Sequence, residues 1–166
     1  MNLRGAFSIT TARPTIREMA PFASYEFLVG NINVGNNKLT RTLIRNWDLR
    51  WEWFTRPGEV IAVSGFYKNF QDPIERFNRS LNGDVSYLNV PKAIVHGTEF
   101  EFRRRPDHTG IKFLENFQIG GNLTLVHAEV DIDPTELSYR ISNGLADSTN
   151  TTRAFGGQSP YVVNLD

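Results

Sequence analysis

The sequence contains no cysteine among its 166 residues. This absence excludes disulfide frameworks, thiol nucleophiles and thiolate metal sites together. No run of about 18 apolar residues occurs, so the sequence encodes no transmembrane helix. The 18 basic residues balance the 18 acidic residues, and no net charge draws the chain to nucleic acid or to anionic lipid. We therefore predict no nucleic-acid partner.

Signatures of catalysis and of metal binding are also missing. The sequence has no Gly-x-Ser-x-Gly elbow and no phosphate-binding loop. Glu99 and Glu101 share one strand face, but paired carboxylates catalyse only where their surroundings separate their acidities, which a wet face does not do. His96, His108 and His127 lack the spacing of a zinc site. We expect no enzyme, no cofactor and no metal site.

The most informative stretch is residues 43 to 54, which alternates with a period of two residues. One face of the predicted strand carries Leu43, Trp47, Leu49, Trp51 and Trp53, and the other carries Asn46, Asp48, Arg50 and Glu52. Arg45 is the exception, since it shares the apolar face near the start of the strand, where a long side chain reaches a wet boundary. The pattern predicts a membrane barrel strand or an unusual sandwich strand.

Alternation continues along the chain and predicts an all-β fold, an antiparallel meander of five to six long amphipathic strands. The predicted strands span residues 3–10, 43–54, 61–68, 93–103 and 117–130, and a further strand begins at 161–165. Residues 12–38 are expected to leave the sheet, with a short helical piece at 16–19 and turn formers at 30–37. Residues 71–92 and 131–160 are expected to be long polar loops.

The connections between these strands alternate in length. Thr55 to Gly58 is a short turn that makes an antiparallel hairpin, whereas most other connections are long. Bacterial outer-membrane barrels combine short periplasmic turns with long external loops, and their strands alternate apolar-out with polar-in. This arrangement assigns Trp51, Trp53 and Phe54 to a periplasmic aromatic girdle and brings Tyr67 and Phe70 near the outer one.

A soluble all-β sandwich is the alternative. Its apolar strand faces would meet in a core, and its function would be binding of a ligand or carbohydrate through exposed aromatic side chains. Strands of about ten residues and loops of more than about 15 residues favour the barrel over the sandwich.

Several short motifs resemble the late barrel of TonB-dependent outer-membrane receptors, and their order and spacing together are fairly specific. The similar segments are Thr11 to Pro14, Arg17 to Phe22, Gly35-Asn36, Leu39 to Arg50, Pro57 to Glu59, Val63 to Phe70, Pro73 to Glu75 and Gly97 to Phe102. The resemblance covers nearly all of the 166 residues.

The resemblance implies a segment of a large importer whose barrel has about 22 strands and is closed by a plug domain. Such importers take up siderophores, cobalamin or oligosaccharides with energy from the TonB complex. We recognise no plug and no closing strand in residues 1–166, and therefore expect a partial barrel in the bacterial outer membrane. Its expected partners are outer-membrane lipid, the remainder of the parent barrel and plug, the TonB complex and a small-molecule ligand.

Five or six strands cannot close a barrel of that size. The isolated segment would expose unpaired strand edges that lipid cannot satisfy. We expect self-association of the isolated segment, and light scattering from a stable monomer without detergent would contradict this.

Four further groups of residues suggest sites, and each has a plainer explanation. Asp131, Asp133 and Glu136 offer oxygen ligands for calcium, although a solvated loop fits their spacing better. Arg103, Arg104 and Arg105 suggest an anion site, although a basic cap at a membrane interface fits better. Arg79, Tyr87 and Asn89 are candidate contacts for a polar ligand or simply loop residues. Sequons at Asn78, Asn122 and Asn150 matter only in a eukaryotic secretory protein. We assign no site from these residues.

Overall fold

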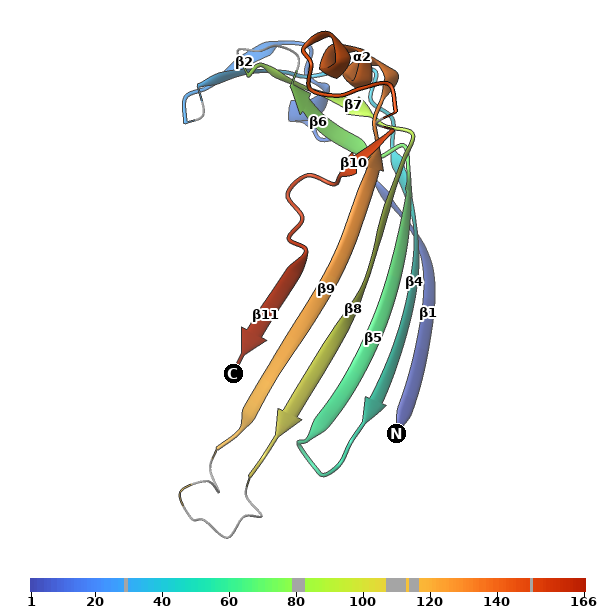
Figure 1. Cartoon of the computed structure of the whole chain (residues 1–166), viewed down its shortest axis with the longest axis vertical. Helices are drawn as coiled ribbons and strands as arrows, with labels where there is room; N and C mark the ends of the chain where they lie inside the picture. Colours follow the sequence, from blue (N-terminus) through green and yellow to red (C-terminus); the bar gives the residue numbers. More distant parts are fainter. Residues whose placement is uncertain (29, 79–82, 107–112, 114–116, 150) are drawn as a thin grey trace.

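The computed structural model describes residues 1–28, 30–78, 83–106, 113, 117–149 and 151–166. Its main body is a seven-stranded sheet in the order β1-β4-β5-β8-β9-β10, with β11 also paired to β9. These strands are β1 (Asn2–Ala12), β4 (Thr42–Trp53), β5 (Val60–Gln71), β8 (Lys92–Arg104), β9 (Ile119–Asp131), β10 (Thr152–Ala154) and β11 (Tyr161–Leu165). They form one curved wall (Figure 1). The predicted antiparallel meander is confirmed.

The two ends of the wall differ, as the connection lengths predict. The β4–β5 turn lies at the same end as the end of β8 and the start of β9, and the connections β1–β4 and β5–β8 lie at the other end (Figure 1). Gly58 has a φ of 83° in the β4–β5 turn, a conformation that glycine adopts at little cost. The strand that begins at residue 161 is confirmed as β11, which pairs antiparallel with β9.

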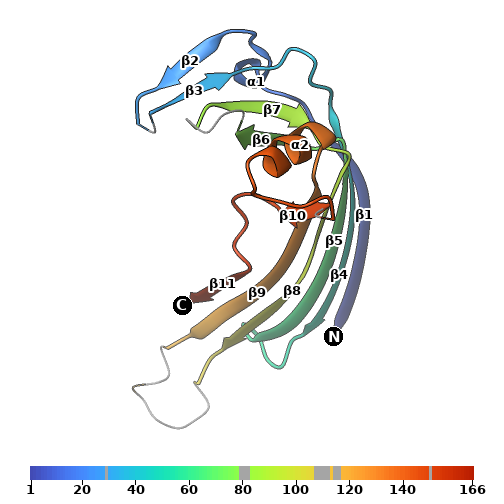
Figure 2. The same ribbon diagram turned by 45° about the horizontal axis from the view of Figure 1, so that its top comes forward.

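The long connections fold into a second unit, here called the cap. It contains α1 (Ile16–Met19), β2 (Ala23–Glu26), β3 (Asn31–Val34), β6 (Ile74–Asn78), β7 (Val85–Asn89) and α2 (Pro134–Ser142). Its sheet has the order β2-β3-β7-β6, and β3 pairs with β7 in parallel. The cap bends over the concave side of the wall (Figure 2). No helix in the described residues is long and apolar enough to cross a membrane.

The cap overturns three of the loop predictions. Residues 30–37 contain β3, residues 71–92 contain β6 and β7, and residues 131–160 contain α2 and β10. These elements are short, and side-chain hydrogen bonds hold several of them. Asn33 Nδ2 donates to the Tyr87 hydroxyl at 3.0 Å, and Asn36 Nδ2 donates to the Tyr87 carbonyl at 2.9 Å. Strands of four or five residues contain too few alternating positions to be recognised from the sequence.

The helical piece at residues 16–19 is confirmed as α1. Thr15 begins it with a capping box: its hydroxyl accepts from the Glu18 N–H, and the Glu18 carboxylate accepts from the Thr15 N–H at 2.7 Å. The two bonds satisfy backbone N–H groups that a helix start leaves without partners. This local signal is why so short a helix is visible in the sequence.

Cross-strand register places the tryptophan side of β4 on the outer face of the wall. One row of register partners crosses five strands: Phe7, Trp47, Tyr67, His96 and His127. Neighbouring rings in this aromatic row lie 5.1 to 6.3 Å apart between centroids. Aromatic pairs at such spacing contribute beyond the area they bury. Tyr67 therefore belongs to an aromatic row that crosses the wall, and its placement near the outer girdle stays a prediction.

The outer face is exposed rather than packed into a core. Leu49 is 57% exposed and Trp53 is 46% exposed. The buried apolar cluster is small and consists of Val90, Ala93 and Val130, with Phe70, Leu88 and Phe155 against it. A soluble sandwich would cover its tryptophan face, so that alternative is wrong. The placement of Phe70 near the outer girdle is also wrong, because its even position in β5 directs it to the opposite, inner face.

The inner face of the wall carries an ion-pair network near the β4–β5 turn. Arg50 donates to Glu52 at 2.9 Å, to Ser64 at 3.0 Å and to Glu101 at 2.5 Å. Arg4 also contacts Glu52 at 3.1 Å. The charged side chains of β4 therefore have partners on β1, β5 and β8. These contacts explain why one face of β4 carries polar residues.

Candidate ligand site beneath the cap

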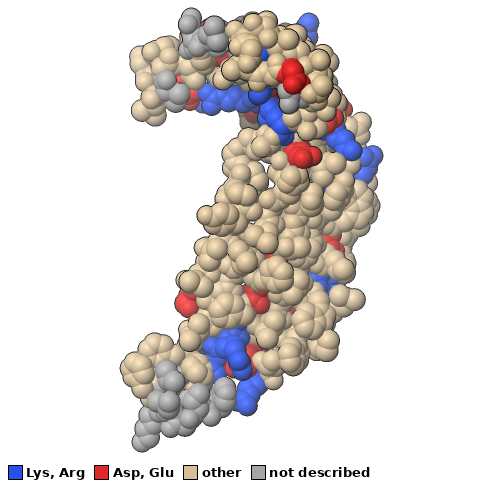
Figure 3. Space-filling view, in the orientation of Figure 1, with Lys and Arg blue, Asp and Glu red and all other residues tan. Residues whose placement is uncertain are grey.

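A polar cavity lies where two elements of the cap meet the short strand β10 of the wall. β6 supplies Arg76, α2 supplies Tyr139 and Arg140, and β10 supplies Arg153. The cavity has a volume of about 350 Å³, within the range of small-molecule sites. Figure 3 shows Lys and Arg side chains gathered along the underside of the cap, toward the hollow of the wall. We call this the arginine pocket.

Local sequence signals explain why α2 forms at this place. Asp133 is the N-cap and accepts from the Thr135 N–H at 2.8 Å, and Pro134 occupies the first turn. A capping aspartate followed by proline is a common helix start. Glu136 and Arg140, four residues apart, pair at 2.6 Å on one side of the helix.

A buried ion-pair cluster fixes the back of the pocket. Arg153 donates to Glu75 at 3.2 Å and to Glu136 at 3.0 Å. The side chains of Glu75 and Glu136 are 11% and 4% exposed. Arg153 itself is 16% exposed. It joins β6, α2 and β10 and therefore acts as a structural residue rather than a free ligand contact.

Arg76 and Arg140 are the cationic side chains that solvent reaches. Their side chains are 48% and 34% exposed. Arg76 has a loose pair with Glu26 at 3.8 Å, and Glu26 is already held by Arg17 at 3.2 Å. The lining contains three arginines and one glutamate. Because guanidinium groups bind planar oxyanions with two hydrogen bonds, the pocket suits an anionic ligand.

Burial changes the acidity of the glutamate behind the pocket. Removal from water raises the pKa of the Glu75 carboxyl, and the nearby Arg153 opposes this rise. A negative charge on Glu75 therefore destabilises the folded state, and the ion pair with Arg153 reduces this destabilisation.

The residues proposed as ligand contacts from the sequence have structural roles where the structure describes them. The Tyr87 hydroxyl accepts from Asn33. Asn89 donates to the Asp72 carbonyl at 2.7 Å and accepts from the Thr40 N–H at 2.8 Å. Arg79 lies outside the described residues.

The carboxylate cluster does not form the solvated loop that its spacing predicts. Asp133 caps α2, and Glu136 is buried between two arginines. In the described part of the chain, no three His, Asp or Glu side chains form a metal-binding group. His96 and His127 do meet across β8 and β9, with ring centroids 5.1 Å apart, but they belong to the aromatic row. His108 lies outside the described residues.

Other sequence candidates occupy positions with plain roles. Glu101 pairs with Arg50 on the inner face, and Arg103 lies 3.9 Å from Glu101. The Arg105 N–H donates to Glu59 at 3.1 Å beside the short turn. Asn122 lies within β9, and Asn78 is exposed at the end of β6. Asn150 lies outside the described residues.

Sequence reasoning missed the arginine pocket because its members are far apart in the chain. Arg76, Arg140 and Arg153 belong to two segments that the sequence predicted to be loops. One signal was available: Asp133, Pro134 and the Glu136–Arg140 spacing together are typical of a helix. Recognising α2 would have placed Arg140 on a defined element.

The sequence profile described as "TonB dependent receptor-like, beta-barrel" matches residues 1–166. The chain belongs to this receptor barrel family. The curved wall of this family member is accordingly a section of a transmembrane β-barrel. A search among curated proteins found no match.

Solved structures with the same fold support the family assignment. The siderophore receptor PirA from Pseudomonas aeruginosa is 22% identical, with a TM-score of 0.57 over 77% of this chain and 22% of its own. Two mutant forms of the ferric enterobactin receptor PfeA from the same bacterium are each 16% identical. Their TM-scores are 0.52 over 78% of this chain and 23% of theirs, and 0.51 over 80% and 23%. This family member therefore spans about a fifth of the structures that it matches.

Proposed function

We propose that the chain is part of the wall and extracellular cap of an outer-membrane, TonB-dependent importer whose cargo is a ferric siderophore. In this proposal a plug domain and further strands belong to the same parent protein, and the TonB complex supplies energy through the plug. Cobalamin and oligosaccharides are disfavoured as cargo, because the solved relatives are described as siderophore and ferric enterobactin receptors.

The open edges of the wall support the partial-barrel proposal. β1 and β11 lie at opposite edges of the sheet, and in the described residues no pairing joins them. A bilayer has no water to satisfy unpaired backbone N–H and C=O groups. Both edges therefore need neighbouring strands, which the rest of a large barrel would supply.

The orientation follows from the two ends of the wall. Outer-membrane barrels place long, structured loops outside the cell and short turns on the periplasmic side. The cap is then extracellular, and the β4–β5 turn with Trp53 beside it is periplasmic. This orientation lets a ligand from the medium meet the arginine pocket before it reaches the interior of the barrel.

The arginine pocket is the single observation that carries the cargo proposal. Many siderophores present iron through catecholate, hydroxamate or carboxylate oxygens, and their iron complexes are often anionic. Arg76 offers an exposed guanidinium group with a loose partner, and Arg140 is partly exposed but already paired with Glu136 at 2.6 Å. Tyr139 adds an aromatic ring and a hydroxyl. Charge-assisted hydrogen bonds of this kind contribute about 1.5 to 3 kcal/mol each.

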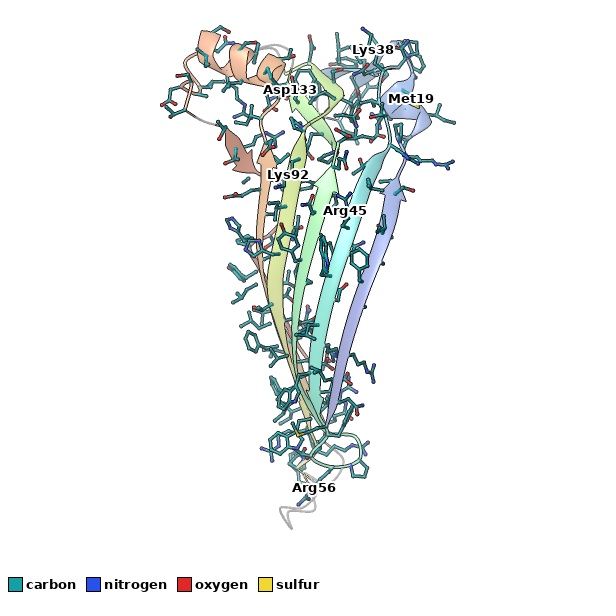
Figure 4. The ribbon with its side chains drawn as sticks, turned by 90° about the vertical axis from the view of Figure 1, so that its right-hand side faces the viewer. Met19, Lys38, Arg45, Arg56, Lys92 and Asp133 are labelled. Carbon is teal, nitrogen blue, oxygen red and sulfur yellow. The ribbon has the colours of Figure 1, made fainter. Side chains whose placement is uncertain are left out.

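The test uses the full-length receptor that contains this segment, expressed in a strain without other siderophore receptors. Arg76→Gln is the informative variant, because Glu26 keeps Arg17 as a partner when Arg76 is lost. We expect binding of an anionic ferric siderophore to weaken about tenfold or more, with slower uptake of radioactive iron. Arg56→Gln removes the same charge at the opposite, short-turn end of the wall, where Figure 4 labels Arg56, and should leave binding unchanged.

Two results would contradict the cargo proposal. One is uptake of cobalamin or an oligosaccharide, but of no ferric siderophore, by the unmodified receptor. The other is equal siderophore affinity for Arg76→Gln and the unmodified receptor in a panel that includes catecholate and hydroxamate chelates.

A further inference from the structure

A large apolar hollow lies on the outer face of the wall, away from the arginine pocket. It has a volume of about 710 Å³ and is open on one side. Its floor is the register row next to the aromatic row, toward the short turns: Gly5, Leu49, Gly65, Thr98 and Leu125. Its upper boundary is the aromatic row itself, with Trp47, Tyr67, His96 and His127 lining it. Glycines at two of the five positions of this row, Gly5 and Gly65, leave a notch in the outer surface below the row of rings.

The notch exists because residue 65 has no side chain, and the fold does not require glycine at this position. A Cβ added at residue 65 meets no atom within 4 Å, and Gly65 is not one of the glycines with positive φ. Neither backbone conformation nor packing within the chain therefore demands glycine. The missing side chain leaves an apolar space that faces the hydrocarbon region of the membrane in this fold.

A cation without a partner lies directly above the hollow. Arg45 is two residues from Trp47 on the same face of β4, about 7 Å closer to the cap. Its side chain makes no hydrogen bond or ion pair with the described residues. Figure 4 views the wall from its convex side, with Arg45 labelled near the upper end of β4. Arginine at an aromatic boundary extends its charge toward lipid headgroups.

Nearby acidic groups on this face do not neutralise Arg45. Glu129 is the acidic member of the same register row, which runs Ile9, Arg45, Asn69, Ile94 and Glu129. It lies three strands away, about 14 Å, and pairs with His127 at 3.1 Å. Asp48 occupies the opposite face of β4. The charge of Arg45 is therefore available to an anion at the membrane boundary.

We propose that this hollow and Arg45 together bind one phosphorylated lipid of the outer leaflet. An acyl chain occupies the notch over Gly65 and contacts Leu49 and Leu125, and the lipid phosphate accepts hydrogen bonds from the Arg45 guanidinium. The chain has no net charge, so the proposal relies on Arg45 alone to attract the lipid phosphate. The proposal requires the wall to lie in a membrane but is independent of the cargo.

The test is native mass spectrometry of the full-length receptor in detergent, titrated with two lipids. Dimyristoyl phosphatidic acid carries acyl chains and a phosphate, and dimyristoylglycerol carries the same chains without phosphate. The unmodified receptor should retain the phosphatidic acid about tenfold more tightly than the diacylglycerol. Inorganic phosphate at millimolar concentration should not displace it, because phosphate alone lacks the chain that fills the notch.

Two variants separate the headgroup from the chain. Arg45→Gln should remove the preference for phosphatidic acid, whereas Gly65→Leu should weaken retention of both lipids by filling the notch. Lys38→Gln, which removes an exposed charge in the cap (Figure 4), and Gly156→Leu, which also enters open space outside the wall, are the matched controls and should bind as the unmodified receptor does. A preference that persists in Arg45→Gln, or unchanged retention by Gly65→Leu, would overturn the proposal. Siderophore uptake is read separately and tests only the function proposed above.

Discussion

The wall and the cap of this receptor segment are stabilised in different ways. The wall consists of strands of up to 13 residues joined by continuous backbone ladders, and its outer face remains exposed for lipid. The cap consists of strands of four and five residues and two helices, tied together by side-chain hydrogen bonds and ion pairs. The wall therefore tolerates changes at its surface but not between its strands, whereas the cap depends on individual polar side chains.

The largest expected effect is in the cap, from Arg153→Leu. This change leaves Glu75 buried without its cation, while Glu136 keeps Arg140. Breaking a buried ion pair costs about 3 kcal/mol. Hydrogen exchange of β6 and α2 in the full-length receptor should accelerate about a hundredfold, with no change in β4 or β5. Arg140→Leu is the control, because Glu136 then keeps Arg153, and its smaller effect should stay within α2. Equal exchange in both variants would show that the cap does not depend on this cluster.

The wall should fail at Gly97 rather than at Gly65. A Cβ at residue 97 would collide with the Leu125 carbonyl and lie 2.6 Å from the Phe66 ring. Gly97→Ala should therefore reduce the free energy of unfolding by about 2 kcal/mol, measured by urea titration of the full-length receptor in detergent. Gly65→Ala, in the neighbouring strand, enters open space and should change it by less than about 0.5 kcal/mol. Similar losses for both variants would contradict the assignment of a tight inner face and an open outer one.

The same contrast explains what the sequence predicts well. Period-two alternation identifies the wall because one face of Trp47, Leu49 and Trp51 meets lipid while the other meets Arg50 and its partners. The cap strand β3 reads Asn-Ile-Asn-Val, which also alternates, but it has only four residues and its asparagines are buried while Ile32 is exposed. The arginine pocket joins residues more than 60 positions apart, and no local pattern encodes such a contact. Phe70 is aromatic, but its position in β5 places it on the inner face against Phe155, because residue parity decides the face of a strand.

A third prediction tests whether Asn89 attaches the cap or contacts a ligand. Its amide bonds the Thr40 backbone and the Asp72 carbonyl, and Asp72 has a φ of 53°. Asn89→Ala removes the partner of the Thr40 N–H and C=O groups, whereas the Asp72 carbonyl keeps the Thr42 hydroxyl at 3.0 Å. The change should cost about 1.5 kcal/mol, measured by urea titration with ferric siderophore affinity in parallel. Asn37→Ala, at an exposed position between β3 and β4 outside the arginine pocket, should change neither quantity. A loss of affinity without a loss of stability would restore Asn89 as a ligand contact.

The smallest expected effect is a pH response of opposite sign at the two ends of the molecule. The Thr55 hydroxyl, at 2.6 Å, and the Arg105 N–H lower the pKa of Glu59 below 4.5. Its contribution to stability is therefore present above pH 4.5 and is lost as the pH falls through the lowered pKa. Burial raises the pKa of Glu75 above 4.5. Its contribution is present below pH 4.5 and is lost as the pH rises through the raised pKa.

The two glutamine variants separate these contributions. Glu59→Gln should lower the unfolding temperature of the full-length receptor at neutral pH, because it removes a carboxylate that the turn stabilises. Glu75→Gln should raise it at neutral pH, because an uncharged amide avoids the cost of a buried charge while Arg153 keeps Glu136. The Glu59→Gln difference from the unmodified receptor should shrink as the pH falls below 4.5 toward the lowered pKa, whereas the Glu75→Gln difference should shrink earlier, as the pH falls from the raised pKa to 4.5. A decrease in unfolding temperature for both variants at neutral pH would contradict this prediction. It would show that the ion pair with Arg153 stabilises ionised Glu75 more than burial destabilises it. The cap and the turn would then respond to acid in the same direction.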